Sequence, residues 1–393
     1  METKCTGNMK ILEKPEDYKN WEKLALHCET IKELTDFEKE KAKRAFQFLK
    51  NEIGDTFLDE AFKERHPIFQ YIINLAPWTR KWIIWFADAL RELREQENYR
   101  SLLNRIKDKN KFIEGLSVLE IAYKLSKAGF NITVDPSVRI SSNEKIPDLK
   151  LVDEDTKEEL FVEISILGES RIARDAFQTM QRITEPLWQS VPFMYYCGRI
   201  HKTLSERHLA YIVKKVGELV EKVKKSNSFN ELIIEDVIEI GIAPENDKEL
   251  LQKWAAERGL KVGEFSGPPF NVDEILRTKR KIEREQKQLP KNRPNILVVK
   301  SNNLFFHTRD IRKAISELEE EIYEYPHVLF GIISGEYMGQ SENVVSMKNQ
   351  HVFIRKNKVD LFVEQYIILF NRFCEYKISP ATITKIYNAF RSY

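Results

Sequence analysis

The sequence predicts an α/β protein in which a mixed sheet flanked by helices follows an all-helical N-terminal region. Three observations support this class. Apolar residues recur at helical spacing from about residue 18 to residue 110, without an alternating strand pattern. Beyond residue 110, short apolar runs typical of strands alternate with amphipathic segments typical of helices. The chain has 393 residues, 42% of them hydrophobic and 32% charged, so it can bury a sizeable core.

The composition excludes several classes of protein. With 14 Gly and 14 Pro, the chain is neither fibrous nor mainly disordered. The net charge is only +2, so a surface that binds phosphate has to be a local patch. Four widely spaced cysteines suggest neither a disulfide framework nor a zinc site. The sequence shows no signal peptide and no run of ~20 apolar residues, so we expect a cytoplasmic protein without a membrane partner.

Composition and pattern divide the chain into three predicted domains. Residues 1–110 form a helical N-terminal domain for recognition or dimerisation. Residues 111–340 form the α/β core with insertions, and residues 341–393 add a C-terminal strand and helix that pack on this core. The charged stretch Arg105–Lys111 is the predicted linker between the first two domains.

The helical region carries an aromatic stripe. Trp78, Trp82 and Trp85 recur at spacings of four and three, which places them on one helix face beside apolar neighbours. Such a face is more typical of core packing or a dimer contact than of base stacking.

Beyond this region, apolar periodicity predicts alternating helices and strands. The expected helices are Phe112–Lys127, Arg171–Thr184, Leu204–Lys225, Lys248–Arg258, Val272–Gln288 and Ile311–Tyr323. The expected strands are Asn131–Ser137, Asp148–Asp153, Leu160–Ser165, Pro192–Gly198, Val237–Ala243, Ile296–Ser301, Val328–Ser334 and His351–Arg355.

One predicted hairpin brings two carboxylates together. If the polar segment 154–157 is its turn, Asp148 and Glu163 fall opposite each other on the two strands. Lys150 and Ser165 each lie two residues from one of these acids, so all four side chains share a face. Facing carboxylates repel unless a cation neutralises them, and Mg²⁺ favours one or two carboxylates plus water and phosphate oxygens. The hairpin therefore predicts a metal site suited to phosphodiester hydrolysis.

A third acid lies in the helix before the hairpin. Glu120 is surrounded in sequence by apolar residues, and a buried carboxylate is costly unless something binds it. Each of these features also has an ordinary explanation, since Pro-Asp often opens a turn and a strand Glu is often solvated. Their order and context together favour a functional site.

The pattern resembles the PD-(D/E)XK, or restriction-endonuclease-like, nuclease superfamily. It comprises an acid in the first helix, a Pro-Asp dipeptide that opens a strand and Glu-x-Ser at the end of the hairpin. The resemblance covers only this segment. It implies a restriction-endonuclease-like mixed sheet and Mg²⁺ or Mn²⁺ held by Glu120, Asp148 and Glu163, with Ser165 and Lys150 completing the predicted catalytic set.

The chain departs from the family at Ser165, where the family usually has lysine. A hydroxyl cannot stabilise an attacking hydroxide as an ammonium does, although some family members have Glu or Gln there. Lys150, Arg171 or Arg174 could supply the charge instead.

The expected helix Val272–Gln288 has two faces of interest. Ile275, Ile282 and Leu289 recur every seven residues as an apolar seam. Four cations line another face and would form a ridge that binds phosphates: Arg277, Lys281, Arg284 and Lys287. The alternative is a solvated face partly paired with Glu283 and Glu285.

These features lead to one expected function and two alternatives. We expect an endonuclease of the restriction or defence type that cuts DNA, with RNA as an alternative substrate. A homodimer would supply the two active sites that are needed to cut both DNA strands. The first alternative is a nucleic-acid-binding protein with a nuclease fold and reduced catalysis, for which Ser165 is the distinguishing residue. The second is a scaffold that binds another protein.

Overall fold

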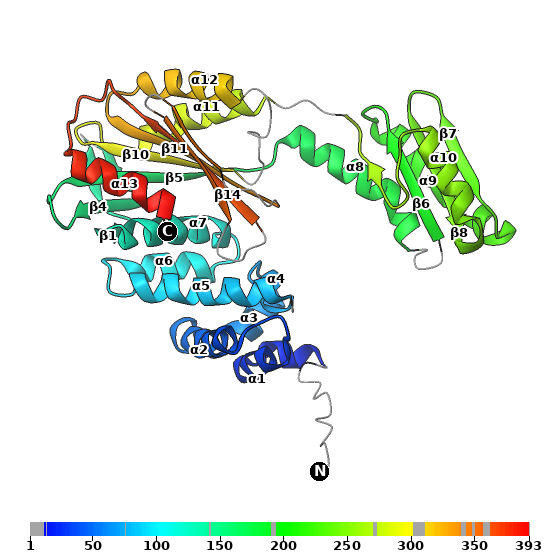
Figure 1. The fold of residues 1–393 in the computed structure, drawn as a ribbon, viewed down its shortest axis with the longest axis horizontal. Coiled ribbons are helices and arrows are strands. Elements are labelled where there is room, and N and C mark those ends of the chain that lie inside the picture. The colour runs from blue at the N-terminus through cyan, green and yellow to red at the C-terminus, as the bar shows by residue number, and fades with distance from the viewer. Residues whose placement is uncertain are drawn as a thin grey trace, which may run out of the picture. The chain divides into compact units, whose positions relative to one another are not determined.

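The computed structural model describes residues 12, 14–74, 76–140, 143–189, 194–269, 273–301, 311–338, 343–347, 350–356 and 362–392. It consists of helices and mixed sheets, with a helical N-terminal region, as predicted (Figure 1). The chain divides into two compact units, Met1–Gly168 with Glu274–Tyr393 and, inserted between them, Glu169–Asp273. Both unit boundaries fall inside the predicted 111–340 core.

Helices alone build the described N-terminal part of the first unit. They are η1 (Pro15–Lys19), α1 (Trp21–His27), η2 (Cys28–Thr30), α2 (Asp36–Ile53), α3 (Phe57–Glu64), α4 (Phe69–Ile72), α5 (Pro77–Leu93) and α6 (Tyr99–Lys107). Helix α2 begins with a capping box between Thr35 and Glu38 and ends at Gly54, whose φ of 119° ends the helix. Helix α5 has a proline at its first position, which suits the fixed φ of that residue.

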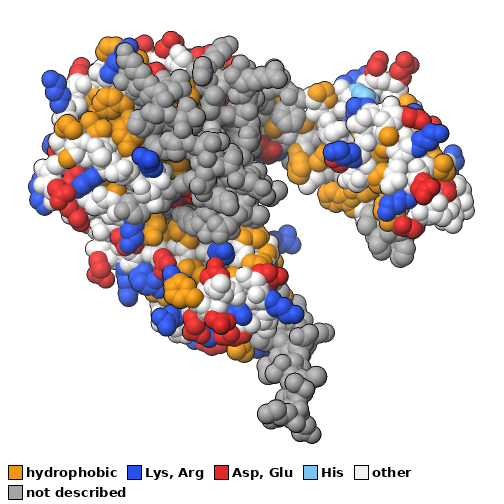
Figure 2. Space-filling model, viewed as in Figure 1, with side chains coloured by type: hydrophobic (Ala, Val, Ile, Leu, Met, Phe, Trp, Pro, Cys, Tyr) orange, Lys and Arg blue, Asp and Glu red, His pale blue; other side chains and the backbone are white. Residues whose placement is uncertain are grey.

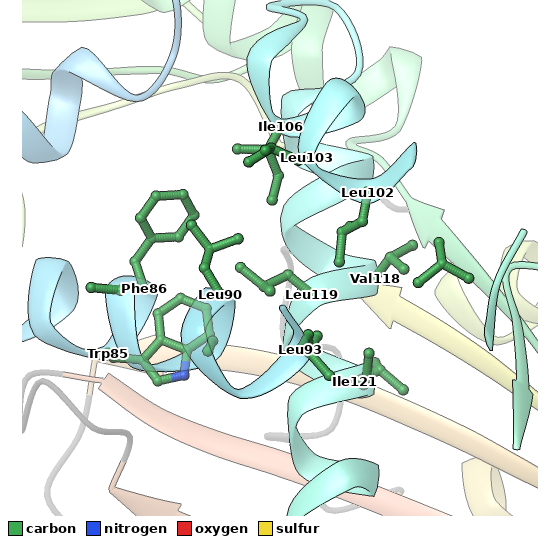
Figure 3. Close-up of a cluster of buried hydrophobic side chains, with 14 of the residues drawn as sticks. Trp85, Phe86, Leu90, Leu93, Leu102, Leu103, Ile106, Val118, Leu119 and Ile121 are labelled. Carbon is green, nitrogen blue, oxygen red and sulfur yellow. The ribbon is translucent and has the colours of Figure 1, made fainter. Parts of the chain in front are cut away.

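Helix α7 (Phe112–Lys127) connects the helical region to the sheet, and its bounds match the prediction. Buried side chains of α5, α6 and α7 form one hydrophobic cluster (Figure 3). Trp82 and Trp85 are buried in it, which confirms core packing for these two members of the aromatic stripe. The stretch Arg105–Lys111 is not a free linker, because it begins inside α6, where Leu102 and Ile106 are buried.

An eight-stranded sheet forms the centre of the first unit. Its order is β1-β4-β5-β10-β11-β14-β13-β12. Strands β5, β10 and β11 are parallel, and all other neighbours are antiparallel. The strands are β1 (Phe130–Val134), β4 (Leu149–Asp153), β5 (Glu159–Leu167), β10 (Asn295–Ser301), β11 (Val328–Met338), β12 (Asn343–Met347), β13 (Gln350–Lys356) and β14 (Phe362–Phe370). A separate hairpin pairs β2 (Val138–Ile140) with β3 (Asn143–Lys145).

The two faces of the sheet contact different helices. On one face, Val162 and Val298 join the cluster that contains α5, α6 and α7. On the other face, Phe161 and Leu297 pack with Ile282 of α11 (Glu274–Glu285) and with α12 (Ile311–Tyr323). Helix α12 has the predicted bounds, and α11 continues into η4 (Gln286–Gln288). Helix α13 (Pro380–Ser392) ends the chain and packs with the first cluster, as expected for a C-terminal helix on the core.

The second unit has a small sheet of its own, ordered β7-β8-β6-β9. Its helices include α9, whose apolar face forms a cluster with this sheet. The elements are α8 (Arg171–Trp188), β6 (Met194–Ile200), α9 (Glu206–Ser226), β7 (Asn230–Ile234), β8 (Ile238–Pro244), η3 (Glu245–Asp247), α10 (Lys248–Glu257) and β9 (Phe265–Ser266). Within the described part of the chain, no helix is long and apolar enough to cross a membrane.

Candidate functional site

The hairpin of β4 and β5 has the register that the sequence predicts. Leu149 pairs with Val162, and the same register continued by one residue places Asp148 opposite Glu163. Asp148 lies directly before β4, where its Oδ2 accepts a hydrogen bond of 2.8 Å from the backbone N–H of Ile164. The two carboxylates are therefore neighbours at one end of the hairpin.

Burial and mutual repulsion set the protonation of this pair. Asp148 is 7% exposed, and burial raises the pKa of its carboxyl against the opposing effect of Arg105. The pKa of Glu163 rises to about 9, first because of burial and then because of the charges on Asp148 and Glu285. Since Asp148 has a guanidinium and a backbone N–H as partners, Glu163 is the member of the pair that holds a proton at neutral pH.

Arg105 of α6 lies at the centre of a larger group of acids. Its guanidinium donates to Asp148 at 2.8 Å, approaches Glu114 at 3.4 Å and forms an ion pair with Asp135. Asp135 directly follows β1, and its backbone N–H donates to the carbonyl of Asp148 at 2.9 Å. Gly115 permits the close approach of α6 and α7, because a Cβ there would lie 3.0 Å from the Cβ of Arg105.

Arg105 and Glu114 belong to this site although the sequence did not predict them there. Glu114 lies six positions before Glu120, so it points about 120° around the helix from it. The available clue was the first turn of the helix, where Glu114 follows a charged stretch that contains Arg105. That stretch resembled a linker rather than part of a site.

Glu120 has a different environment from the predicted one. It is 5% exposed, forms an ion pair with Lys300 of β10 and accepts a hydrogen bond of 3.0 Å from the hydroxyl of Tyr366. Tyr366 also contacts Glu364, which pairs with the fully buried Lys124 at 3.2 Å. These residues form a buried network between α7, β10 and β14.

The two faces of the sheet separate Glu120 from Glu163. Lys300 lies two residues after Val298 on the same strand, so both side chains point to the face that α7 covers. Glu163 lies two residues after Phe161, so both side chains point to the face that α11 covers. The expected trio of metal ligands is therefore not brought together: Asp148 and Glu163 are neighbours, whereas Glu120 neutralises a buried lysine.

The two remaining predicted catalytic residues lie near the pair. Ser165 is 7% exposed and occupies the face of Glu163, as predicted from the pleat. Lys150 on β4 forms an ion pair of 2.7 Å with Glu159 on β5, so its positive charge is paired with that carboxylate. Arg171 and Arg174 belong to α8 of the second unit, where Arg171 pairs with Asp175 at 3.7 Å.

The four cations predicted to bind phosphate lie on or directly after α11, and each has an acidic partner on the same segment. The pairs are Arg277 with Glu274 at 2.7 Å, Lys281 with Glu285 at 3.1 Å, Arg284 with Glu285 at 2.5 Å and Lys287 with Glu283 at 4.0 Å. Acidic and basic side chains are likewise interspersed on the described surface in view (Figure 2). This pairing favours the alternative of a solvated, self-neutralised face. The apolar seam is confirmed, because Ile282 and Leu289 are buried in one hydrophobic cluster and Ile275 packs against that cluster.

The hairpin offers a metal ion two carboxylates, those of Asp148 and Glu163. Among the described residues, no group of three or more His, Cys, Asp or Glu side chains is placed to hold a metal ion. Two carboxylates still fit Mg²⁺, which usually binds one or two carboxylates and completes its coordination with water and phosphate oxygens. No protein-family model, curated protein or solved structure matches this chain.

Proposed function

We propose that this protein is a metal-dependent endonuclease that hydrolyses phosphodiester bonds in DNA, with Asp148 and Glu163 as the ligands of Mg²⁺ or Mn²⁺. One observation carries the proposal. The hairpin register sets the two carboxylates opposite each other, and Glu163 forms no ion pair within the described residues. A carboxyl that is raised in pKa by burial and by a neighbouring acid is a frequent feature of functional sites.

A divalent cation would resolve the repulsion within this pair. Binding would replace the proton on Glu163 and leave coordination positions for water and for phosphate oxygens. The bound ion would activate water and neutralise charge on the phosphoryl group. Asp148 is already oriented by Ile164 and Arg105, so it needs little reorganisation to serve as a ligand.

The surrounding fold is compatible with a restriction-endonuclease-like core, which we include in the proposal. An acid-bearing helix precedes the hairpin, Asp148 lies directly before β4, and Glu163 and Ser165 lie on β5. A cytoplasmic location and a homodimer, in which each copy cuts one strand, complete the proposal.

Cleavage assays on the intact chain test this function. Supercoiled plasmid and single-stranded RNA are incubated separately with Mg²⁺, Mn²⁺ or EDTA. We expect plasmid cleavage only with metal, and loss of that cleavage in Asp148→Asn and Glu163→Gln. Exposed Glu154 in the hairpin turn provides the matched control, Glu154→Gln, which should cut normally. Metal-dependent cutting that survives in both site variants would reject the assignment.

A second function is favoured by Ser165 alone. Because β5 carries a hydroxyl where a cation would assist water, the protein could bind nucleic acid at this site without cutting it. Gel-shift binding of DNA by the intact chain, with no cleavage in either metal, would select this second function.

A further inference from the structure

Arg105 supplies the positive charge closest to the carboxylate pair. It contacts Asp148 at 2.8 Å, and its charge also acts on Glu163. Its side chain is 17% exposed, so part of it reaches solvent beside the pair. The guanidinium makes its bonds to the acids through Nη1 and Nη2, and its Nε forms no hydrogen bond with any described residue.

We propose that Arg105 is a catalytic residue of this site, whose guanidinium binds a non-bridging oxygen of the scissile phosphate. This inference rests on the proposed nuclease function. The planar guanidinium matches phosphate oxygens and stays protonated at every pH of interest. It can therefore stabilise the charge that develops on the phosphoryl group.

Other cations near the hairpin are less suited to this role. Lys150 pairs with Glu159 at 2.7 Å and Lys281 of α11 pairs with Glu285 at 3.1 Å, and among the described residues neither lysine contacts Asp148 or Glu163. Ser165 carries no charge. Arg105 instead donates directly to Asp148, one of the proposed ligands, and its ion pair with Asp135 helps to hold the guanidinium beside the carboxylate pair.

The chemical step balances without a proton from Arg105. The oxygen of water bonds to phosphorus while the bond from phosphorus to the leaving oxygen breaks. Water loses one proton and the leaving oxygen gains one, so the proton count closes. Arg105 remains a cation throughout and donates only hydrogen bonds.

The test compares Arg105→Met with wild type in the intact chain. Single-turnover cleavage of plasmid is measured with Mg²⁺, and Mn²⁺ binding is measured separately by calorimetry without DNA. We expect the cleavage rate constant to fall on the order of 100-fold, as for the loss of one charge-stabilising donor. Mn²⁺ affinity should be unchanged or tighter, because removing a cation removes its repulsion of the metal. Arg94→Met, which breaks the ion pair of Arg94 with buried Glu52, should change neither quantity.

A rescue variant separates a lost charge from a lost structural contact. Ser165 shares a strand face with Glu163, so Ser165→Lys in the Arg105→Met background should restore the rate at least about 10-fold. If Arg105→Met loses its folded circular dichroism spectrum, Arg105→Gln replaces it, since glutamine keeps hydrogen-bond donors but no charge. Arg105→Gln should then show the same loss of rate.

Several outcomes would overturn the inference. An unchanged rate in the folded Arg105 variants would remove Arg105 from catalysis. A rise in both rate and Mn²⁺ affinity would make it a competitor of the metal, and a loss of Mn²⁺ binding would make it a positioning residue for Asp148. If wild type itself neither binds Mn²⁺ nor cuts, the proposed function fails and this inference fails with it.

Discussion

Arg105 and Asp148 lie 43 positions apart in the sequence, yet the guanidinium of one donates a hydrogen bond of 2.8 Å to the carboxylate of the other. This contact joins α6 to the start of β4. The helical region therefore contributes to the candidate site as well as to the core. A mutation in α6 can alter the carboxylate pair without touching the hairpin.

Metal binding should release a proton. Because the pKa of Glu163 is about 9, this carboxyl is protonated at pH 7.5 and has to ionise to bind a cation. We expect about one proton to be released per metal ion at this pH. Calorimetric titration of Mn²⁺ in two buffers with different ionisation enthalpies measures this number. An apparent enthalpy that is independent of the buffer would contradict the assignment of the proton to Glu163.

The same carboxyl should make stability depend on pH. Its pKa is raised from 4.5 to about 9 on folding, so between these values the folded state binds more protons than the unfolded state. The free energy of unfolding then falls as pH rises through this window. The Glu163→Gln variant has no carboxyl to ionise here, so its free energy of unfolding does not fall in this way. It should be more stable than wild type at pH 8 by at least about 1 kcal/mol.

Urea unfolding in EDTA at pH 5 and pH 8 tests this expectation. The advantage of Glu163→Gln over wild type should grow with pH, whereas exposed Glu154→Gln should show no such trend. An advantage that is equal at both pH values would mean that Glu163 ionises normally in the folded protein.

Short-range features of the site could be predicted from the sequence. The turn between β4 and β5 and the two-residue pleat fix which side chains face each other, so Asp148 and Glu163 follow from local spacing alone. Helix α7 also follows locally, because its apolar periodicity is continuous and Gly129, with a φ of 90°, lies just beyond its end.

Long-range partners could not be predicted in this way. The periodicity of α7 places Glu120 in the interior but does not say which strand residue it meets, and Lys300 lies 180 positions away. Strand β14 was missed because a strand buried on both faces lacks the alternation that marks a half-buried one, as Ile367 and Ile368 illustrate. The second unit was not separated because its helices and strands have the same patterns as those of the core.

The cations of α11 are expected to contribute little to DNA binding. Arg277, Lys281 and Arg284 all form ion pairs within the helix, so a phosphate would have to compete with a carboxylate for each of them. Replacing the three by Ala should leave the slope of log affinity against log salt within about one unit of wild type. A slope reduced by roughly three units would instead assign this face to phosphate contacts.

Glu120 should stabilise the fold, whereas Glu114 should affect the metal. Removing Glu120 takes a buried carboxylate away from Lys300 and from the hydroxyl of Tyr366, so Glu120→Ala should lower the free energy of unfolding by about 3 kcal/mol. Glu114 is half exposed beside Arg105, so Glu114→Gln should cost little stability but weaken Mn²⁺ binding through the lost negative charge. Urea unfolding and calorimetric Mn²⁺ titration of both variants give the comparison. If Glu120→Ala remains as stable as wild type and loses Mn²⁺ binding, Glu120 is a metal ligand after all, and the sheet face that α7 covers has to open when the metal binds.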